Sequence, residues 1–167
     1  MPDTLETIGQ YTFFKNYNMV NFTMPNSVTS IGEQAFYFCA ALESVEFSEN
    51  LQSIGYRAFA ATALYEIDLP STFIEVQEAA FMSCGNLKLA TFRGSVQTLA
   101  KDAFLGCSTL NTIKFCGTTP PANLGTNSIF TMFVTKVIVP VGYAGAYRTR
   151  LTSYNSSWGS TVSIVEE

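Results

Sequence analysis

The stretch that decides the fold is Ser30-Ile31-Gly32-Glu33-Gln34-Ala35-Phe36-Tyr37-Phe38-Cys39-Ala40-Ala41-Leu42-Glu43-Ser44-Val45-Glu46-Phe47. Most of the chain repeats this pattern with variations. An Ala-Phe step or its equivalent ends at Phe13, Phe36, Phe59, Phe81 and Phe104, with spacings of 23, 23, 22 and 23 residues. The 22-residue interval, from Phe59 to Phe81, is one residue short. The missing residue belongs between Phe59 and Leu64, because the apolar positions after Phe59 arrive one residue early. A fixed period in this range predicts a solenoid.

Each repeat unit contains two kinds of local pattern. Val45-Glu46-Phe47 alternates apolar and polar residues, which is typical of a half-buried strand. The segment Glu33–Phe36 is too short for an ordinary helix, so it predicts one helical or 3₁₀ turn with the Phe in the core. One such unit cannot bury its own apolar face, whereas stacked units can.

The fold class predicted from these patterns is α/β, in the form of a right-handed leucine-rich-repeat solenoid. It has about five repeats of 22–23 residues over residues 1–115, a parallel strand ladder and short helical or 3₁₀ turns. Residues 116–167 break the pattern and are predicted to form a C-terminal cap of the same domain. The cap contains a further strand at Thr135–Pro140 and a short helix carrying Tyr147.

The composition limits the classes of partner. Charged residues make up only 13% of the chain, and the net charge is −4. The nine Lys and Arg residues are scattered, which argues against binding of nucleic acid or of an anionic membrane. No stretch approaches the roughly 18 apolar residues that span a bilayer, so direct membrane insertion is not expected. The low charge favours an extracellular protein or an assembly module over a cytosolic protein.

The N-terminal residues already belong to a repeat. Leu5-Glu6-Thr7-Ile8-Gly9 matches Val28-Thr29-Ser30-Ile31-Gly32, and no signal sequence or polar cap precedes it. Two interpretations are open: the chain is a piece of a longer or processed protein, or its first turn is an open edge. The first is favoured, because an unpaired edge promotes aggregation.

The units resemble the BspA-like (Treponema-type) leucine-rich-repeat family. The resemblance rests on Ser30-Ile31-Gly32…Ala35-Phe36…Cys39…Leu42…Val45…Phe47, on its copies at Ser53–Phe59, Ala80–Leu87 and Ala103–Leu110, and on the ending Val137–Pro140 with Tyr143, Tyr147 and Trp158. It covers roughly residues 5–160. The position of the Cys before the strand Leu departs from the commoner leucine-rich consensus. The resemblance implies a secreted or surface-attached bacterial protein that functions in adhesion and protein binding.

Three cysteines occupy one repeat position: Cys39, Cys84 and Cys107. Cys84 and Cys107 belong to adjacent turns about 5 Å apart, near the range for a disulfide. A disulfide or a metal pair is one interpretation. A stack of buried thiols is the favoured one, because Thr62 and Asn16 fill the same position elsewhere. The chain has no His and no CxxC motif, so no metal site and no cofactor are predicted.

Catalytic groups are scarce. Without His, the usual nucleophilic triads cannot form. A carboxylate pair chosen from Glu46, Glu66 and Asp68 could in principle act on a glycoside. The favoured interpretation is that these residues are solvated on the strand face, and the protein is predicted not to be an enzyme.

The strand ladder presents the main candidate binding surface. Residues between the buried strand positions are predicted to point outward, on the concave side, in two columns. One column is Thr23, Glu46, Asp68, Thr91, Lys114 and Ile138, and its neighbour is Asn21, Ser44, Glu66, Leu89, Thr112 and Lys136. Both columns change from polar through acidic to basic along the solenoid, a pattern suited to protein binding.

These observations predict a non-enzymatic surface or secreted module that binds a protein or glycan, in adhesion to host or neighbouring cells. The alternative is a structural spacer within a larger surface protein. A carboxylate-based glycoside hydrolase is the third interpretation.

Overall fold

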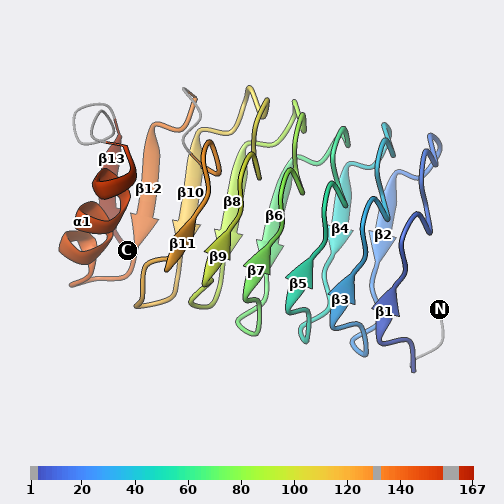
Figure 1. The fold of residues 1–167 in the computed structure, drawn as a ribbon, viewed down its shortest axis with the longest axis horizontal. Coiled ribbons are helices and arrows are strands. Elements are labelled where there is room, and N and C mark those ends of the chain that lie inside the picture. The colour runs from blue at the N-terminus through green and yellow to red at the C-terminus, as the bar shows by residue number, and fades with distance from the viewer. Residues whose placement is uncertain (1–3, 130–132, 156–161) are drawn as a thin grey trace.

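The computed structural model describes residues 4–129, 133–155 and 162–167, and it is a solenoid with two parallel strand ladders. Figure 1 shows the turns stacked along the long axis, with the N-terminal turn at one end and α1 with β13 at the other. The first sheet contains β1 (Thr7–Ile8), β3 (Ser30–Ile31), β5 (Ser53–Ile54), β7 (Glu75–Val76), β9 (Thr98–Leu99) and β11 (Asn123–Leu124). The predicted solenoid fold is confirmed.

The second ladder carries the alternating strands. It consists of a pair, β2 (Asn21–Thr23) and β4 (Ser44–Glu46), and a five-stranded sheet of β6 (Glu66–Leu69), β8 (Leu89–Phe92), β10 (Thr112–Phe115), β12 (Lys136–Val139) and β13 (Ser163–Glu166). The break between β4 and β6 follows the shortened repeat, although the Tyr65 amide still donates to the Glu43 carbonyl at 3.2 Å. The sequence predicted one ladder, and the Ser-Ile pairs form another.

The segments around each Ala-Phe step are turns, and the prediction of a helical or 3₁₀ turn there was wrong. Their amides bond alternately within the turn and to the next turn: Tyr37 N–H to Gln34 O at 3.1 Å, but Phe36 N–H to Ala58 O at 2.7 Å. Gln34 and Phe38 take positive φ values of 52° and 60°. A continuous 3₁₀ helix needs all its amides for itself, whereas here half of them join neighbouring turns.

The core is one cluster that runs the length of the solenoid, and it includes buried residues from both ladders. The Phe residues of the Ala-Phe steps lie in this core, as predicted, and their rings stack. Phe36, Phe59, Phe81 and Phe104 are fully buried, with neighbouring ring centroids 4.8–5.5 Å apart and interplanar angles of 3–7°. Each ring therefore packs on its counterpart one turn away, which explains why the pattern needs repetition to be stable.

The repeat pattern continues beyond residue 115. β11 pairs with β9, so the first sheet has six strands where the sequence predicted five repeats. β12 pairs with β10 in the predicted register, Thr112 with Lys136 and Ile113 with Val137. The sixth unit is not recognised from the sequence because the loop before β11 is longer and Ser128-Ile129 stands after β11 where the other units have an Ala-Phe step.

The single helix among the described residues is α1 (Ala144–Tyr154), which contacts β13. It carries the predicted Tyr147, whose buried ring lies 5.2 Å from that of Phe115. The Tyr147 hydroxyl donates to the carbonyls of Gly117 (2.8 Å) and Thr119 (3.2 Å). Trp158 lies outside the described residues. No helix in the described part of the chain is long and apolar enough to cross a bilayer.

Candidate functional site

The outer face of the second ladder carries all the predicted site residues. Strand register aligns Asp68, Thr91, Lys114 and Ile138 in one column, and Glu66, Leu89, Thr112 and Lys136 in its neighbour. Thr23 with Glu46, and Asn21 with Ser44, pair in the same way on β2 and β4. These residues are exposed or half-buried, while the residues between them on β6 to β12 are buried. That they contact a ligand remains a prediction.

A hollow of about 480 Å³ opens at the N-terminal half of this face. Its lining includes Thr23, Asn26, Glu46, Glu49, Asp68 and Arg93. Three of these are carboxylates and one is a guanidinium, so the hollow is net acidic. Thr23 donates to a Glu46 carboxylate oxygen at 3.0 Å, which fixes one wall. We call these six residues the acidic hollow.

Arg93 organises the acidic hollow. Its Nε and Nη2 donate to the two oxygens of Asp68 at 2.9 and 2.8 Å, and its Nη1 donates to Glu49 at 2.8 Å. Hydrogen bonds with Asp68 and then Glu49 raise the pKa of Arg93 above its ordinary value. The bidentate pair holds the Asp68 carboxylate in a fixed plane.

The sequence pattern does not identify Arg93 or Glu49 as site residues. Both lie just after a strand, Arg93 after β8 and Glu49 in the loop after β4, outside the alternating positions. They are 44 residues apart in sequence. Arg93 follows Phe92, which pairs with Leu69, so its counterpart in the preceding unit is Pro70, and no comparison at that position points to Asp68 or Glu49.

The C-terminal half of the face carries the basic residues. Lys114 Nζ donates to Glu167 of the chain's last segment at 3.1 Å, and this hydrogen bond raises the Lys114 pKa. Lys136 is exposed on β12. Leu89, half-buried, lies between the acidic and basic halves. The predicted change from acidic to basic along the face is therefore present in the structure.

Two of the three candidate carboxylates already accept hydrogen bonds from other side chains. Both oxygens of Asp68 already accept hydrogen bonds from Arg93, and the Glu46 carboxylate accepts one from Thr23. Glu66 is exposed at the start of β6 and does not line the acidic hollow. The two catalytic carboxyl groups of a glycosidase flank one substrate bond and lie about 5–10 Å apart, depending on whether the second acts as nucleophile or as base.

The cysteine column consists of free thiols. Cys39, Cys84 and Cys107 are buried and donate to the carbonyls of Phe13, Phe59 and Phe81 at 3.0–3.1 Å. Burial raises the pKa of the Cys39 thiol. These contacts support the interpretation as buried thiols, each bonded to the preceding turn. No group of three or more His, Cys, Asp or Glu residues among those described could hold a metal ion.

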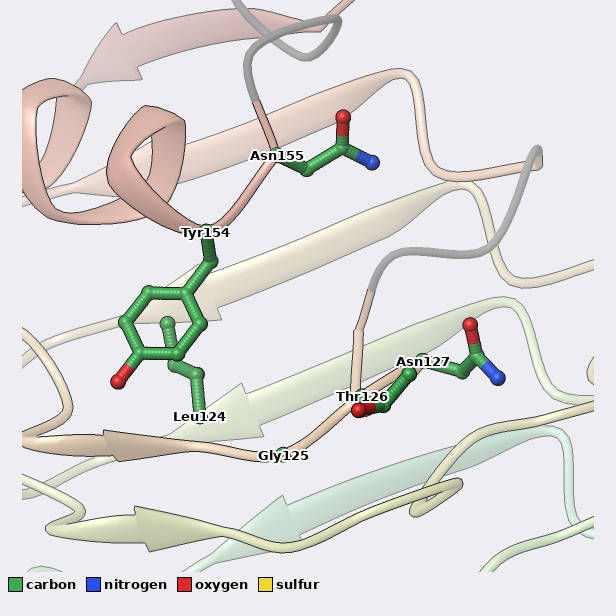
Figure 2. Close-up of a pocket in the computed structure, with 6 residues that line it drawn as sticks. All are labelled: Leu124, Gly125, Thr126, Asn127, Tyr154 and Asn155. Atoms are coloured by element: carbon green, nitrogen blue, oxygen red, sulfur yellow. The ribbon is translucent and has the colours of Figure 1, made fainter.

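A second hollow, of about 290 Å³, lies between the segment that follows β11 and the end of α1. Figure 2 shows the Tyr154 ring beside Leu124, with Thr126 and Asn127 on the adjoining segment. Arg150 Nη2 donates to the Tyr154 hydroxyl at 3.2 Å, which lowers the Tyr154 pKa. None of the predicted site residues lines this hollow.

Comparison with known proteins gives a consistent result. The protein-family model described as the BspA type leucine rich repeat region matches residues 2–128 in six copies. The search of curated proteins finds no match. Six copies agree with the six strands of the first sheet, and not with the five repeats predicted from the sequence.

Three solved structures that share this fold are bacterial proteins. The T. pallidum leucine rich repeat protein TpLRR has a TM-score of 0.67 at 19% identity, with 100% of this chain and 85% of that chain covered. The pneumococcal vaccine antigen PcpA has a TM-score of 0.73 at 19% identity, covering 99% and 40%. A leucine-rich repeat protein from Bacteroides ovatus has a TM-score of 0.65 at 18% identity, covering 99% and 47%.

This chain therefore spans less than half of two of these proteins, and identities this low indicate a shared fold only. The family match covers most of the sequence and includes every Ala-Phe step that defines the repeats. The chain belongs to the BspA-type leucine-rich-repeat family.

Proposed function

We propose that the chain is a non-enzymatic recognition module of a bacterial surface or secreted protein. It binds a protein or glycan ligand in adhesion, through the outer face of the second ladder. The observation that carries this proposal is the charge arrangement on one continuous face, with the acidic hollow at one end and Lys114 and Lys136 at the other. The description of PcpA as a vaccine antigen supports a surface or secreted location.

The charge arrangement favours a protein as the ligand of this face. Surface charges of opposite sign at two ends orient a partner with the complementary arrangement and speed its association. A hollow of about 480 Å³ lies within the roughly 300–1,000 Å³ of ordinary ligand sites, so one basic side chain of the partner fits beside Glu46. Binding through such contacts weakens as salt concentration rises.

An array of matrix proteins, glycans and the chain itself, probed at low and high salt, tests the proposal. The Glu46→Lys/Asp68→Lys variant reverses the charge of the acidic hollow. Glu75→Lys/Glu78→Lys is the matched control, because it makes the same change in net charge on β7 and the turn after it. Saturable, salt-sensitive binding that only the first variant loses supports the proposal. Equal binding by both variants contradicts it.

The spacer function is the second candidate, and the ion pairs favour it. Arg93 neutralises part of the acidic hollow, and Glu167 neutralises Lys114, so the face satisfies several of its own charges. A folded chain, verified by circular dichroism, that binds nothing on the array at either salt concentration would favour the spacer. The absence of turnover on glycoside substrates would separate both candidates from a hydrolase.

A further inference from the structure

Exposed aromatic side chains gather on a different surface, the edge formed by the turns that lead from the first sheet to the second. We define the aromatic edge as Tyr11, Phe14, Tyr17, Tyr37 and Phe38. Four of them are 38–53% exposed. Their rings contact one another in sequence, with centroids 5.5 Å apart for Tyr11–Phe14 and Phe14–Tyr37, 5.6 Å for Tyr37–Phe38 and 6.3 Å for Phe38–Tyr17. The patch is therefore continuous across two turns.

The fold does not require aromatic residues at these positions. The residue after the core Phe is aromatic in the first two units, Phe14 and Tyr37, but is Ala60, Met82 and Leu105 in the next three. The position of Phe38 is filled by Lys15, Ala61, Ser83 and Gly106 in the other units. Because small and polar residues serve equally well elsewhere, the aromatic edge needs another explanation.

Two members of the edge occupy strained backbone positions. Tyr11 and Phe38 have φ values of 58° and 60°, in the left-handed region that bulky residues rarely adopt. Neither ring fills the core, since they are 46% and 41% exposed. The same two turn positions take positive φ in the other units, at Gln34 and Arg57 and at Lys15, Ala61 and Ser83, so the backbone conformation belongs to the turn and only the choice of an aromatic residue there is particular to this edge.

Polar groups border the aromatic edge. Gln34 Nε2 donates to Glu33 Oε1 at 3.1 Å and to the Tyr11 hydroxyl at 3.4 Å, which forms an exposed network of hydroxyl, amide and carboxylate. On the other side, Tyr37, Phe38 and Arg57 line a hollow of about 190 Å³. Arg57 Nε is buried and has no hydrogen-bond partner among the described residues. A sugar has apolar C–H groups and polar hydroxyl groups. An exposed aromatic ring beside hydrogen-bonding side chains suits both.

We propose that the aromatic edge binds a neutral oligosaccharide. The C–H bonds on one face of a pyranose are positively polarised and pack on the negative face of an aromatic ring. The sugar hydroxyls bond to Glu33, Gln34 and the Tyr11 hydroxyl, and one ring enters the hollow at Arg57. This site lies apart from the outer face of the second ladder (the strand face), so it goes beyond the function proposed above and does not depend on it.

The exposed area favours a glycan over a protein partner or a second copy. At about 200 Å² per aromatic side chain, the four exposed residues offer on the order of 350 Å², less than half of the roughly 800 Å² that each side of a stable protein interface buries. In the next unit, Ala60 and Ala61 occupy the positions of Tyr37 and Phe38. Because these side chains are small, the aromatic patch does not continue into a larger apolar face. A chain of a few sugar rings covers this length.

Titration calorimetry of the purified chain with cellohexaose, laminarihexaose, maltohexaose, mannohexaose and chitohexaose tests the proposal. We expect saturable binding of at least one of them, unchanged in 1 M NaCl. Phe38→Gly is the central variant, because Gly106 occupies the same position with φ 78°. Relief of the strained backbone should keep or raise the melting temperature, while the affinity falls at least tenfold. Tyr17→Ala should lower the affinity to a similar degree.

Two controls separate this site from others. Tyr65→Ala removes a Tyr that is 47% exposed outside the aromatic edge and should bind like the unmodified chain. Glu46→Lys/Asp68→Lys should also keep sugar binding, whatever its effect on the strand face. The proposal is overturned if no hexasaccharide binds at millimolar concentration or if Phe38→Gly binds normally. It is also overturned if sedimentation shows a dimer that Phe38→Gly abolishes.

Discussion

At the scale of single residues, the stacked Phe rings are the main source of stability. Phe59 and Phe81 are fully buried and stack on a ring from each neighbouring turn. We expect Phe59→Ala or Phe81→Ala to lower the free energy of unfolding by about 3–5 kcal/mol, because each leaves a large cavity between two turns. Chemical denaturation measures this loss. Leu105→Ala, at a 38% exposed site, is the control, and a loss below about 1 kcal/mol for the Phe variants would refute their role.

The neighbouring turn leaves no room for a side chain at Gly94. A Cβ at this position would lie 2.2 Å from the Ser71 carbonyl oxygen, which is backbone and cannot rotate away. We therefore expect Gly94→Ala to destabilise the fold by about 1–3 kcal/mol through overpacking. Gly85→Ala is the matched control, since nothing lies within 4 Å of its Cβ. Thermal unfolding of the two variants side by side measures the difference, and equal melting temperatures would show that the turns separate easily.

At the scale of elements, α1 is held by a hydroxyl whose ionisation can be followed. Burial raises the pKa of Tyr147 above its ordinary value of 10.0. A raised folded-state pKa gives stability that is complete below about pH 10 and is lost as the pH rises toward the folded pKa. Tyr147→Phe removes two hydrogen bonds and should cost about 1–3 kcal/mol at pH 7. Denaturation at pH 7 and pH 11 measures this difference, which should shrink at pH 11. A difference that does not change with pH would contradict a buried neutral hydroxyl.

The elements also show what a sequence pattern can and cannot predict. The alternation in Val45-Glu46-Phe47 identified the second ladder and placed Glu46 and Asp68 on its outer face, because side-chain direction on a strand follows from parity alone. The Ala-Phe segments are predicted as helical turns, because the sequence pattern shows only that Phe36 is buried. It does not show that the Phe36 amide donates to a carbonyl of the next turn. The turn-to-turn hydrogen bonds depend on stacking, which no single unit contains.

The same limit applies to the candidate site. Thr23 and Glu46 could be predicted as neighbours, since they occupy one strand position in adjacent units. Arg93 could not be paired with Glu49 from the pattern, because loop residues have no fixed direction and the contact crosses two turns. In the sequence, Phe14 and Tyr17 are only separate large residues of the first unit. Their rings form one patch with those of Tyr37 and Phe38 because the two turns stack.

At the scale of the whole molecule, each turn contacts only its neighbours, so stability should vary along the solenoid. Amides of the central turns, such as Phe59 N–H bonded to Ala80 O at 2.8 Å, lie between two packed turns. We expect hydrogen exchange, followed by mass spectrometry, to be slowest there and fastest in the first turn, which has a described neighbour on one side only.

Two variants test whether a lost contact affects mainly the neighbouring turns. Phe81→Ala should speed exchange most in the units of Phe59, Phe81 and Phe104, and progressively less toward the first unit, because a nearest-neighbour array transmits a lost contact with decreasing effect. Phe13→Ala should speed exchange only in the first two units, since Phe13 stacks on Phe36 alone within its column. If either variant accelerated exchange equally in every unit, the solenoid would unfold as one cooperative body, and the aromatic edge could not loosen without the strand face doing so too.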